Sequence, residues 1–117
     1  MSPRTILVVG IGLLVAADVV LAKGVALWTV GLGVILWGAH MALTQGIFAR
    51  MIADAAAPER RATSFGAFFF ASGIAALLAS LGAGLLWDRS GPAATFTAGA
   101  AIAAVAATML ILLPKRA

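Results

Sequence analysis

The stretch that decides the fold is Thr5–Ala22, which reads TILVVGIGLLVAADVVLA and contains one charged residue, Asp18. A helix rises 1.5 Å per residue, so this run covers most of the ~30 Å hydrocarbon core of a bilayer. Backbone groups in lipid must be hydrogen-bonded within the segment, and the run lacks the two-residue alternation of a barrel strand. We therefore expect a membrane-spanning helix over residues 5–22.

Three further apolar runs follow, at residues 25–49, 63–87 and 93–113, and the second helix is expected to continue to about residue 54. The chain has 117 residues, of which 63% are hydrophobic and 10% charged. Soluble domains are about 45–50% apolar and about 25% charged. The sequence predicts an all-α polytopic membrane protein with four transmembrane helices in an antiparallel bundle. One domain, 1–117, would contain helices at about 5–22, 25–54, 63–87 and 93–113.

The positive charges predict the orientation of the bundle, because cytoplasmic loops carry an excess of Lys and Arg. With both termini on one side, the other side carries only Lys23 and Arg89. The side of the termini carries Arg4, Arg50, Arg60, Arg61, Lys115 and Arg116. We expect both termini in the cytoplasm of a bacterial cell and the chain in the inner membrane as a multi-pass protein.

Several classes of function are disfavoured by the composition. The chain has no cysteine and one histidine, so it offers no thiolate chemistry and no pair of His ligands for zinc. Its four acids form no obvious catalytic pair, and no stretch alternates aromatic and basic residues as nucleic-acid sites do. We expect no enzyme activity, no cofactor, no metal and no nucleic-acid partner.

Small residues recur at helix-packing intervals in three of the segments. Gly24, Gly31 and Gly38 are seven apart, as are Gly66, Gly73 and Ser80, whereas Gly99, Ala103 and Ala107 are four apart. Close approach along such stripes drives helix association in lipid. The spacing favours three packing stripes, although Gly and Ala are also common throughout this chain.

Asp18 is an ionisable residue inside the first apolar run. Such residues are costly in a membrane and are functional candidates. Asp18 is the proton-coupling candidate of the sequence. The alternative is a structural role near the interface, since the predicted helix ends about 6 Å further on.

A polar edge marks the second segment, where His40, Thr44 and Gln45 are the cavity-lining candidates. Thr44 shares a face with His40, whereas Gln45 lies about 140° away, so two edges are present. Polar edges in membrane helices usually face other helices or a water-filled cavity. A hydrogen-bonded packing histidine is the alternative for His40.

The polar loop after this segment contains Arg50, Asp54, Glu59 and Arg61. Arg50 and Asp54 are four apart, so a helical extension would let them pair. A solvated turn that only obeys the charge rule is the alternative interpretation.

Three stretches in order resemble the C-terminal end of bacterial major facilitator superfamily transporters. They are GAHMALTQGIFARMIAD (Gly38–Asp54), APERRATSFG (Ala57–Gly66) and GLLWDRSGPAATF (Gly84–Phe96). The family pattern has "AD…P.E.RGTAFG" after its tenth helix and "G.LWD..GP..TF" between its last two. Ala62 departs from that pattern, which usually has glycine there.

The resemblance implies a role for each segment. The second would line the cavity, the third would lie between the two halves of the transporter, and the first and fourth would be supporting helices. Arg50, Asp54, Glu59 and Arg61 would belong to a cytoplasmic gating loop, and Asp88 and Gly91 to an outer turn.

The function implied is transport of a small solute, as a permease or exporter, with a proton as the candidate coupling ion. Such transporters have about twelve helices in two opposed halves. Four helices cannot supply both halves, so we expect a fragment, a truncated product or a subunit that needs other chains or missing helices besides the lipid bilayer. The alternatives are a self-contained four-helix homo-oligomeric multidrug-type transporter and a non-transporting membrane scaffold.

Overall fold

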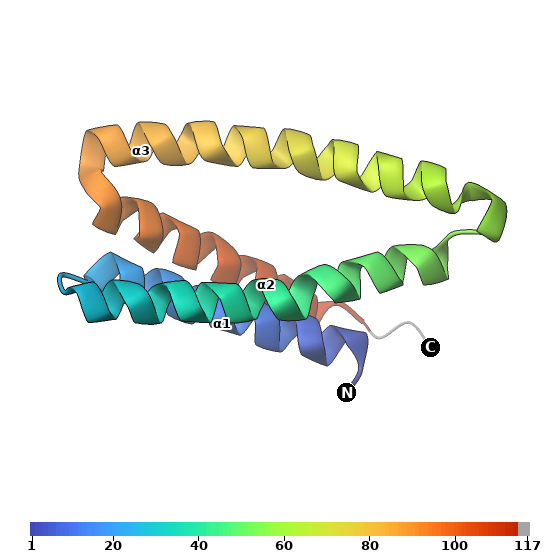
Figure 1. Ribbon diagram of the computed structural model, residues 1–117, viewed down its shortest axis with the longest axis horizontal. Helices are drawn as coiled ribbons and strands as arrows, with labels where there is room; N and C mark the ends of the chain where they lie inside the picture. Colours follow the sequence, from blue (N-terminus) through green and yellow to red (C-terminus); the bar gives the residue numbers. More distant parts are fainter. Residues whose placement is uncertain (115–117) are drawn as a thin grey trace.

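A computed structural model describes residues 1–114 of the chain, and this part is helical without any strand. Its elements are α1 (Pro3–Lys23), α2 (Leu27–Ala55), the 3-10 turn η1 (Pro58–Arg60) and α3 (Arg61–Leu112). Figure 1 shows three long rods, of which α3 is folded back on itself. Lys115 and Arg116, which the orientation argument used, lie outside the described residues.

α1 and α2 begin where the sequence offers a local start signal. Ser2 caps α1, because its Oγ accepts a hydrogen bond from the Thr5 amide at 3.2 Å, and Pro3 occupies the first helical turn. At the start of α2, Thr29 Oγ1 donates to the Ala26 carbonyl oxygen at 2.6 Å. The contact at Thr29 closes a short turn around Gly24, which lies close to its expected position.

A compact turn joins α2 to α3. The Arg60 amide donates to the Ala57 carbonyl oxygen at 2.9 Å, and Pro58 begins η1. Arg61 Nε donates to the Ala53 carbonyl oxygen at 3.2 Å, which ties the start of α3 to the end of α2. The expected long polar loop is therefore mostly helical, and its irregular part is confined to residues 56–57.

The expected loop at residues 88–92 is a sharp bend within one helical element. Gly91 has φ 85° and ψ 178°, and Pro92 follows it. This backbone region is essentially limited to glycine, and proline resumes a helix readily at its first turn. Trp87 and Phe96 meet across the bend with ring centroids 6.0 Å apart and nearly perpendicular planes. The bend divides α3 into a first part, residues 61–90, and a second part, residues 92–112.

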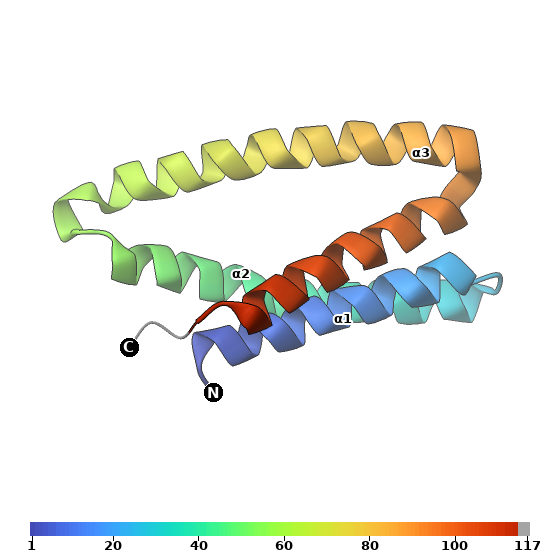
Figure 2. The ribbon, with the colours of Figure 1, turned by 180° about the vertical axis from the view of Figure 1, so that it is seen from behind.

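α1 is the centre of the packing. It contacts α2 along its length and also packs against α3, whereas α2 and α3 touch little. Figure 2 shows the second part of α3 lying across α1, and the first part standing away from both other helices. The molecule measures 49 × 30 × 25 Å. Its core is small, with Leu7, Ala17, Ala100 and Ala103 as the buried apolar residues.

Glycines permit the closest helix contacts, but they are mostly not those of the predicted stripes. A Cβ at Gly10 would lie 2.6 Å from Thr44 Cγ2, and one at Gly33 would lie 2.5 Å from Leu21 Cγ. Gly99, from the predicted stripe of the last segment, packs against Asp18. A Cβ added at Gly31, Gly38, Gly66 or Gly73 would meet no described atom of another helix within 4 Å.

The prediction of packing stripes therefore differs from the structure on α2 and the first part of α3. The spacing places each set of small residues on one face of its helix. It does not tell which glycine of that face meets a neighbouring helix. That choice depends on where the helix axes cross, which is a tertiary property.

Candidate functional site

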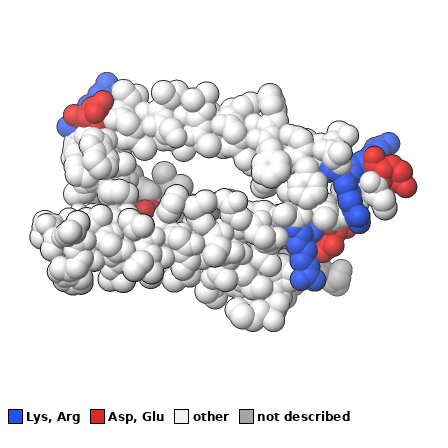
Figure 3. Space-filling view, viewed as in Figure 1, with Lys and Arg blue, Asp and Glu red and all other residues white. Residues whose placement is uncertain are grey.

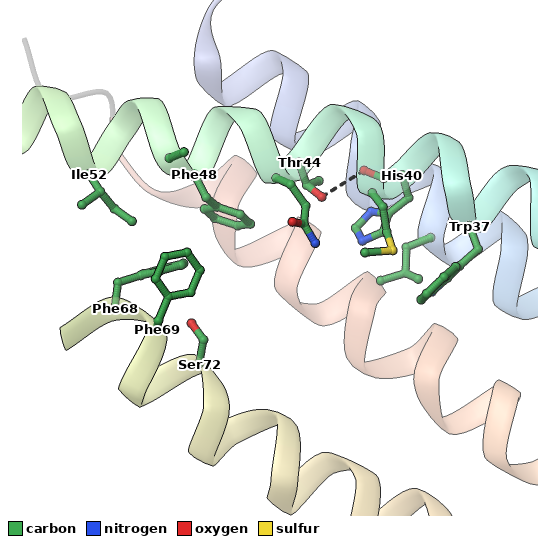
Figure 4. Close-up of a pocket in the computed structure, with 12 residues that line it drawn as sticks. Trp37, His40, Thr44, Phe48, Ile52, Phe68, Phe69 and Ser72 are labelled. Carbon is green, nitrogen blue, oxygen red and sulfur yellow. Dashed lines mark hydrogen bonds between the residues drawn. The ribbon is translucent and has the colours of Figure 1, made fainter. Parts of the chain in front are cut away.

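A cavity of about 420 Å³ lies between α2 and the first part of α3. One wall is a face of α2, and the other comes from the start of α3 (Figure 4). The residues that line it are Leu14, Trp37, His40, Met41, Thr44, Gln45, Phe48, Ala49, Ile52, Phe68, Phe69 and Ser72. The volume falls within the range of small-molecule sites, about 300–1,000 Å³.

His40 belongs both to this cavity and to the contact between α1 and α2. Its Nδ1 lies 2.8 Å from the Gly10 carbonyl oxygen. A carbonyl oxygen only accepts, so Nδ1 carries the hydrogen and donates it to Gly10. The fixed tautomer holds the ring in one orientation, which combines the packing and cavity-lining roles that the sequence left as alternatives.

Thr44 and Gln45 have different surroundings. Thr44 is 4% exposed, lies against Gly10, and its hydroxyl donates to the His40 carbonyl oxygen at 2.9 Å. Its polar atom is thus satisfied within its own helix, and its methyl group fills the contact with α1. Gln45 is exposed and lines the cavity.

Aromatic rings from both walls meet in the cavity, and the sequence analysis did not identify them. Phe48 of α2 and Phe68 of α3 have ring centroids 5.9 Å apart, and Phe69 lies edge-on to Phe68 at 5.5 Å. Ser72 adds a hydroxyl one turn further along (Figure 4). The run Phe68–Phe70 was the available signal, but an aromatic run in an apolar segment has the same appearance whether it faces lipid or a cavity.

Asp18 does not line this cavity. Its side chain is 9% exposed and packs against Gly99 of α3, where an added Cβ would lie 2.8 Å from Oδ2. The structure therefore separates the proton-coupling candidate from Gln45 and places it at the junction of α1 with α3.

The charged residues gather at the two ends of the molecule, and the surface between them is almost free of charge in Figure 3. At one end Arg50 and Asp54 form an ion pair at 3.6 Å, with side chains 70% and 72% exposed. Arg61 bonds to Ala53 nearby, whereas exposed Glu59 makes no ion pair within residues 1–114. The structure brings three of the four gating-loop candidates together.

Asp88 and Gly91 lie at the bend of α3, away from that loop (Figure 1). The N-terminus and the C-terminal end of α3 lie at the same end as the α2–α3 turn, and the turn at Gly24 lies with the bend. Among the described residues, no group of three or more His, Asp or Glu side chains could hold a metal ion.

Comparison with known proteins finds no match to any family model, curated protein or solved structure. The class of the protein follows from the helices themselves. The most apolar windows of α1, α2 and the η1–α3 segment have mean hydropathies of 2.5, 1.4 and 2.0, and all three helices are long enough to cross a bilayer. Helices of this length and composition indicate an all-helical membrane protein.

Proposed function

We propose that the chain forms four membrane-spanning segments of a major facilitator-type secondary transporter. The bend at Gly91 would divide α3 into the third and fourth spans, because each part then has a length of about 30 Å or more at 1.5 Å per residue. A solute would pass along the face of α2 that carries His40 and Gln45.

The cavity between α2 and α3 is the observation that carries this proposal. It combines an amide and an imidazole with aromatic rings from two helices, and it lies along apolar rods between the charged ends of the molecule. Ligand sites are mostly apolar, with a few convergent polar groups that fix orientation. A polar edge at membrane depth is otherwise costly, which favours a role in a pathway.

The places of the family-like stretches support the proposal. The APERRATSFG stretch forms the turn between α2 and α3, and the GLLWDRSGPAATF stretch forms the bend at the opposite end. Inner loop and outer turn would thus lie on opposite sides of a bilayer, as the resemblance requires.

A complete pathway needs a second bundle opposite the first. The first part of α3 offers the surface for it, since Phe69, Phe70, Leu77 and Leu81 are 58–72% exposed there. We propose that further helices, from another chain or from further segments, close the cavity on this side.

Cysteine accessibility tests the pathway, because the chain contains no cysteine of its own. In cell membranes, Gln45→Cys should react with a charged, membrane-impermeant thiol reagent such as sulfonatoethyl methanethiosulfonate. The matched control is Gly46→Cys at the same depth, which turns away from the cavity and meets no described atom within 4 Å. Equal protection of both cysteines would contradict a water-filled pathway along α2.

A further inference from the structure

A second groove, with a volume of about 760 Å³, lies at the end of the molecule that carries the N-terminus. It is open to the surroundings rather than enclosed, and all three long helices contribute to it. Arg4 and Leu7 come from α1, Met51 comes from α2, and Leu110 comes from α3. None of these residues lines the cavity between α2 and the first part of α3, so the groove is a separate feature of the molecule.

Arg4 is the charged residue among the described residues that line this groove. Its Nη2 donates a hydrogen bond to the Ile111 carbonyl oxygen, which joins the start of α1 to the last turn of α3 (Figure 2). A guanidinium has more N–H donors than one carbonyl oxygen can accept. Arg4 is partly exposed and forms no ion pair within residues 1–114. Its positive charge and its remaining donors are therefore available to a ligand.

Apolar side chains form the groove next to Arg4. Leu7 lies about 4.5 Å further along α1, because a helix rises 1.5 Å per residue. Leu7 is buried, whereas Met51 of α2 and Leu113 of α3 are 43% and 58% exposed. A ligand that fits this groove needs a negatively charged group for Arg4 beside an apolar body for the other side chains.

The groove lies where a bilayer would change from headgroups to hydrocarbon. Charged residues gather at this end of the molecule, and the surface between the two ends is almost free of charge (Figure 3). α1 begins at Pro3 and carries no charged residue from Thr5 to Ala17. Arg4 would therefore lie at the level of the lipid phosphates, with Leu7 beside the acyl chains. A guanidinium suits phosphate especially well, because two of its N–H groups can bond to two phosphate oxygens.

We propose that this groove binds one anionic phospholipid, whose phosphate contacts Arg4 and whose acyl chain lies against Leu7 and Met51. Free phosphate would satisfy the guanidinium but leave the apolar part of the groove empty. A zwitterionic phospholipid would bring an ammonium group that offsets the charge of its phosphate. The site requires helices that cross a membrane, but it does not depend on the solute pathway, because the two share no lining residue.

Photo-crosslinking tests the site in the unmodified chain. The protein is placed in phosphatidylcholine vesicles that contain a small fraction of phosphatidylglycerol with a diazirine near the headgroup end of its acyl chain. A phosphatidylcholine probe with the same diazirine chain serves as the matched lipid. After illumination, trypsin yields Thr5–Lys23, Met51–Arg60 and Ser90–Lys115, which contain residues of the groove. The anionic probe should label these three peptides more strongly than the zwitterionic probe does.

The peptide Ala62–Arg89 is the internal control. It exposes Phe70 and Leu78, at 72% and 64%, but lines no part of the groove. The two probes should label it equally. Unlabelled phosphatidylglycerol should remove the excess labelling of the groove peptides, and inorganic phosphate should not. An equal ratio of the two probes in all four peptides would indicate lipid that only surrounds the helices and would overturn the proposal, as would displacement by inorganic phosphate.

A pair of matched variants tests the contact with the phosphate. Arg4→Gln still has a donor for Ile111 but loses the charge, so about tenfold more unlabelled phosphatidylglycerol should be needed for displacement, the effect of one charge-assisted hydrogen bond. Arg60→Gln removes the same charge at the same end but outside the groove, and displacement should not change. An unchanged result for Arg4→Gln would overturn Arg4 as the phosphate ligand.

A second pair tests the place of the acyl chain. Leu110→Trp should fill the groove and reduce the labelling of Met51–Arg60 by the anionic probe. Leu112→Trp, at a position that is 76% exposed and outside the groove, should leave this labelling unchanged. Equal labelling of the two variants would overturn the groove as the site of the lipid.

Discussion

At the scale of single residues, glycines, which have no side chain, determine where the helices approach one another most closely. Gly10 admits the methyl group of Thr44, Gly33 admits Leu21, and Gly99 admits the carboxyl of Asp18. In lipid the association of helices depends on such close packing, because apolar surface gains nothing by leaving lipid for protein. An added methyl group at each of these three positions should therefore disturb a contact between helices.

Gly10→Ala should destabilise the contact between α1 and α2. Its Cβ would lie 2.6 Å from Thr44 Cγ2, so the helices must move apart. Overpacking of this kind costs about 1–3 kcal/mol. We expect a lower apparent Tm in detergent, followed by the loss of helical circular dichroism.

The control for this prediction is Gly12→Ala on the same helix, where the described residues leave open space around the new Cβ. Its Tm should stay the same or rise slightly, because alanine favours helix over glycine. Equal Tm values for the two variants would show that α1 and α2 do not approach closely at Gly10.

At the scale of elements, the sequence predicted the apolar runs well and the connections less well. The start of α1 at Pro3, the break near Gly24 and the end of α2 at Ala55 are each within a few residues of expectation. The stretch 88–92 was expected to be a loop because it contains Asp, Ser, Gly and Pro. The helix instead continues to Gly91, whose freedom at positive φ concentrates the whole change of direction in one residue.

Gly91→Ala should disturb the bend of α3. The backbone at φ 85° and ψ 178° is accessible essentially to glycine alone, and an unfavourable conformation of this kind costs about 1–3 kcal/mol. The bend would relax, so Trp87 would lose its edge-on contact with Phe96. A lower apparent Tm and a changed tryptophan emission spectrum are the expected results.

Gly84→Ala is the appropriate comparison, because Gly84 is helical and open on the same element. It should leave both the Tm and the tryptophan emission close to those of the parent chain. If Gly91→Ala has the same Tm and tryptophan emission as Gly84→Ala, the backbone at the bend does not require glycine, which contradicts the prediction.

At the scale of the whole molecule, the charged residues gather at the two ends of the long helices, and the two ends differ in positive charge. The described termini and the α2–α3 turn lie at one end with Arg4, Arg50, Arg60 and Arg61. Lys23 lies at the end of α1 beside the first turn, and Arg89 lies just before the bend of α3. The excess of positive charge at the first end predicts that it faces the cytoplasm.

Single cysteines should reveal this orientation in intact cells. Ser90→Cys should react with a membrane-impermeant maleimide added outside, whereas Ser2→Cys and Glu59→Cys should react only after the cells are opened. All three positions lie outside or at the ends of the long helices. Reaction of every position from both sides would instead indicate dual topology and favour a homo-oligomeric four-helix transporter.

The candidate site could be predicted only in part. His40 and Gln45 were recognisable because polar residues are conspicuous in an apolar helix, and both line the cavity. Phe48, Phe68 and Phe69 were not, because an aromatic residue in an apolar run has the same appearance whether it faces lipid or a cavity. Asp18 was recognisable as an acid, but its burial against Gly99 was not, since that contact joins residues far apart in the chain.

The sequence by itself determined the helical class of this protein, its long apolar segments and the clustering of charge at their ends. Each of these depends on local composition, because an apolar run in lipid has little choice but helix. The tertiary structure alone decided which glycines meet a partner, that the chain turns back at the single residue Gly91, and that Asp18 packs against Gly99 while Gln45 lines a cavity. These depend on how the helix axes cross, which is set by side-chain packing between distant segments rather than by any single one.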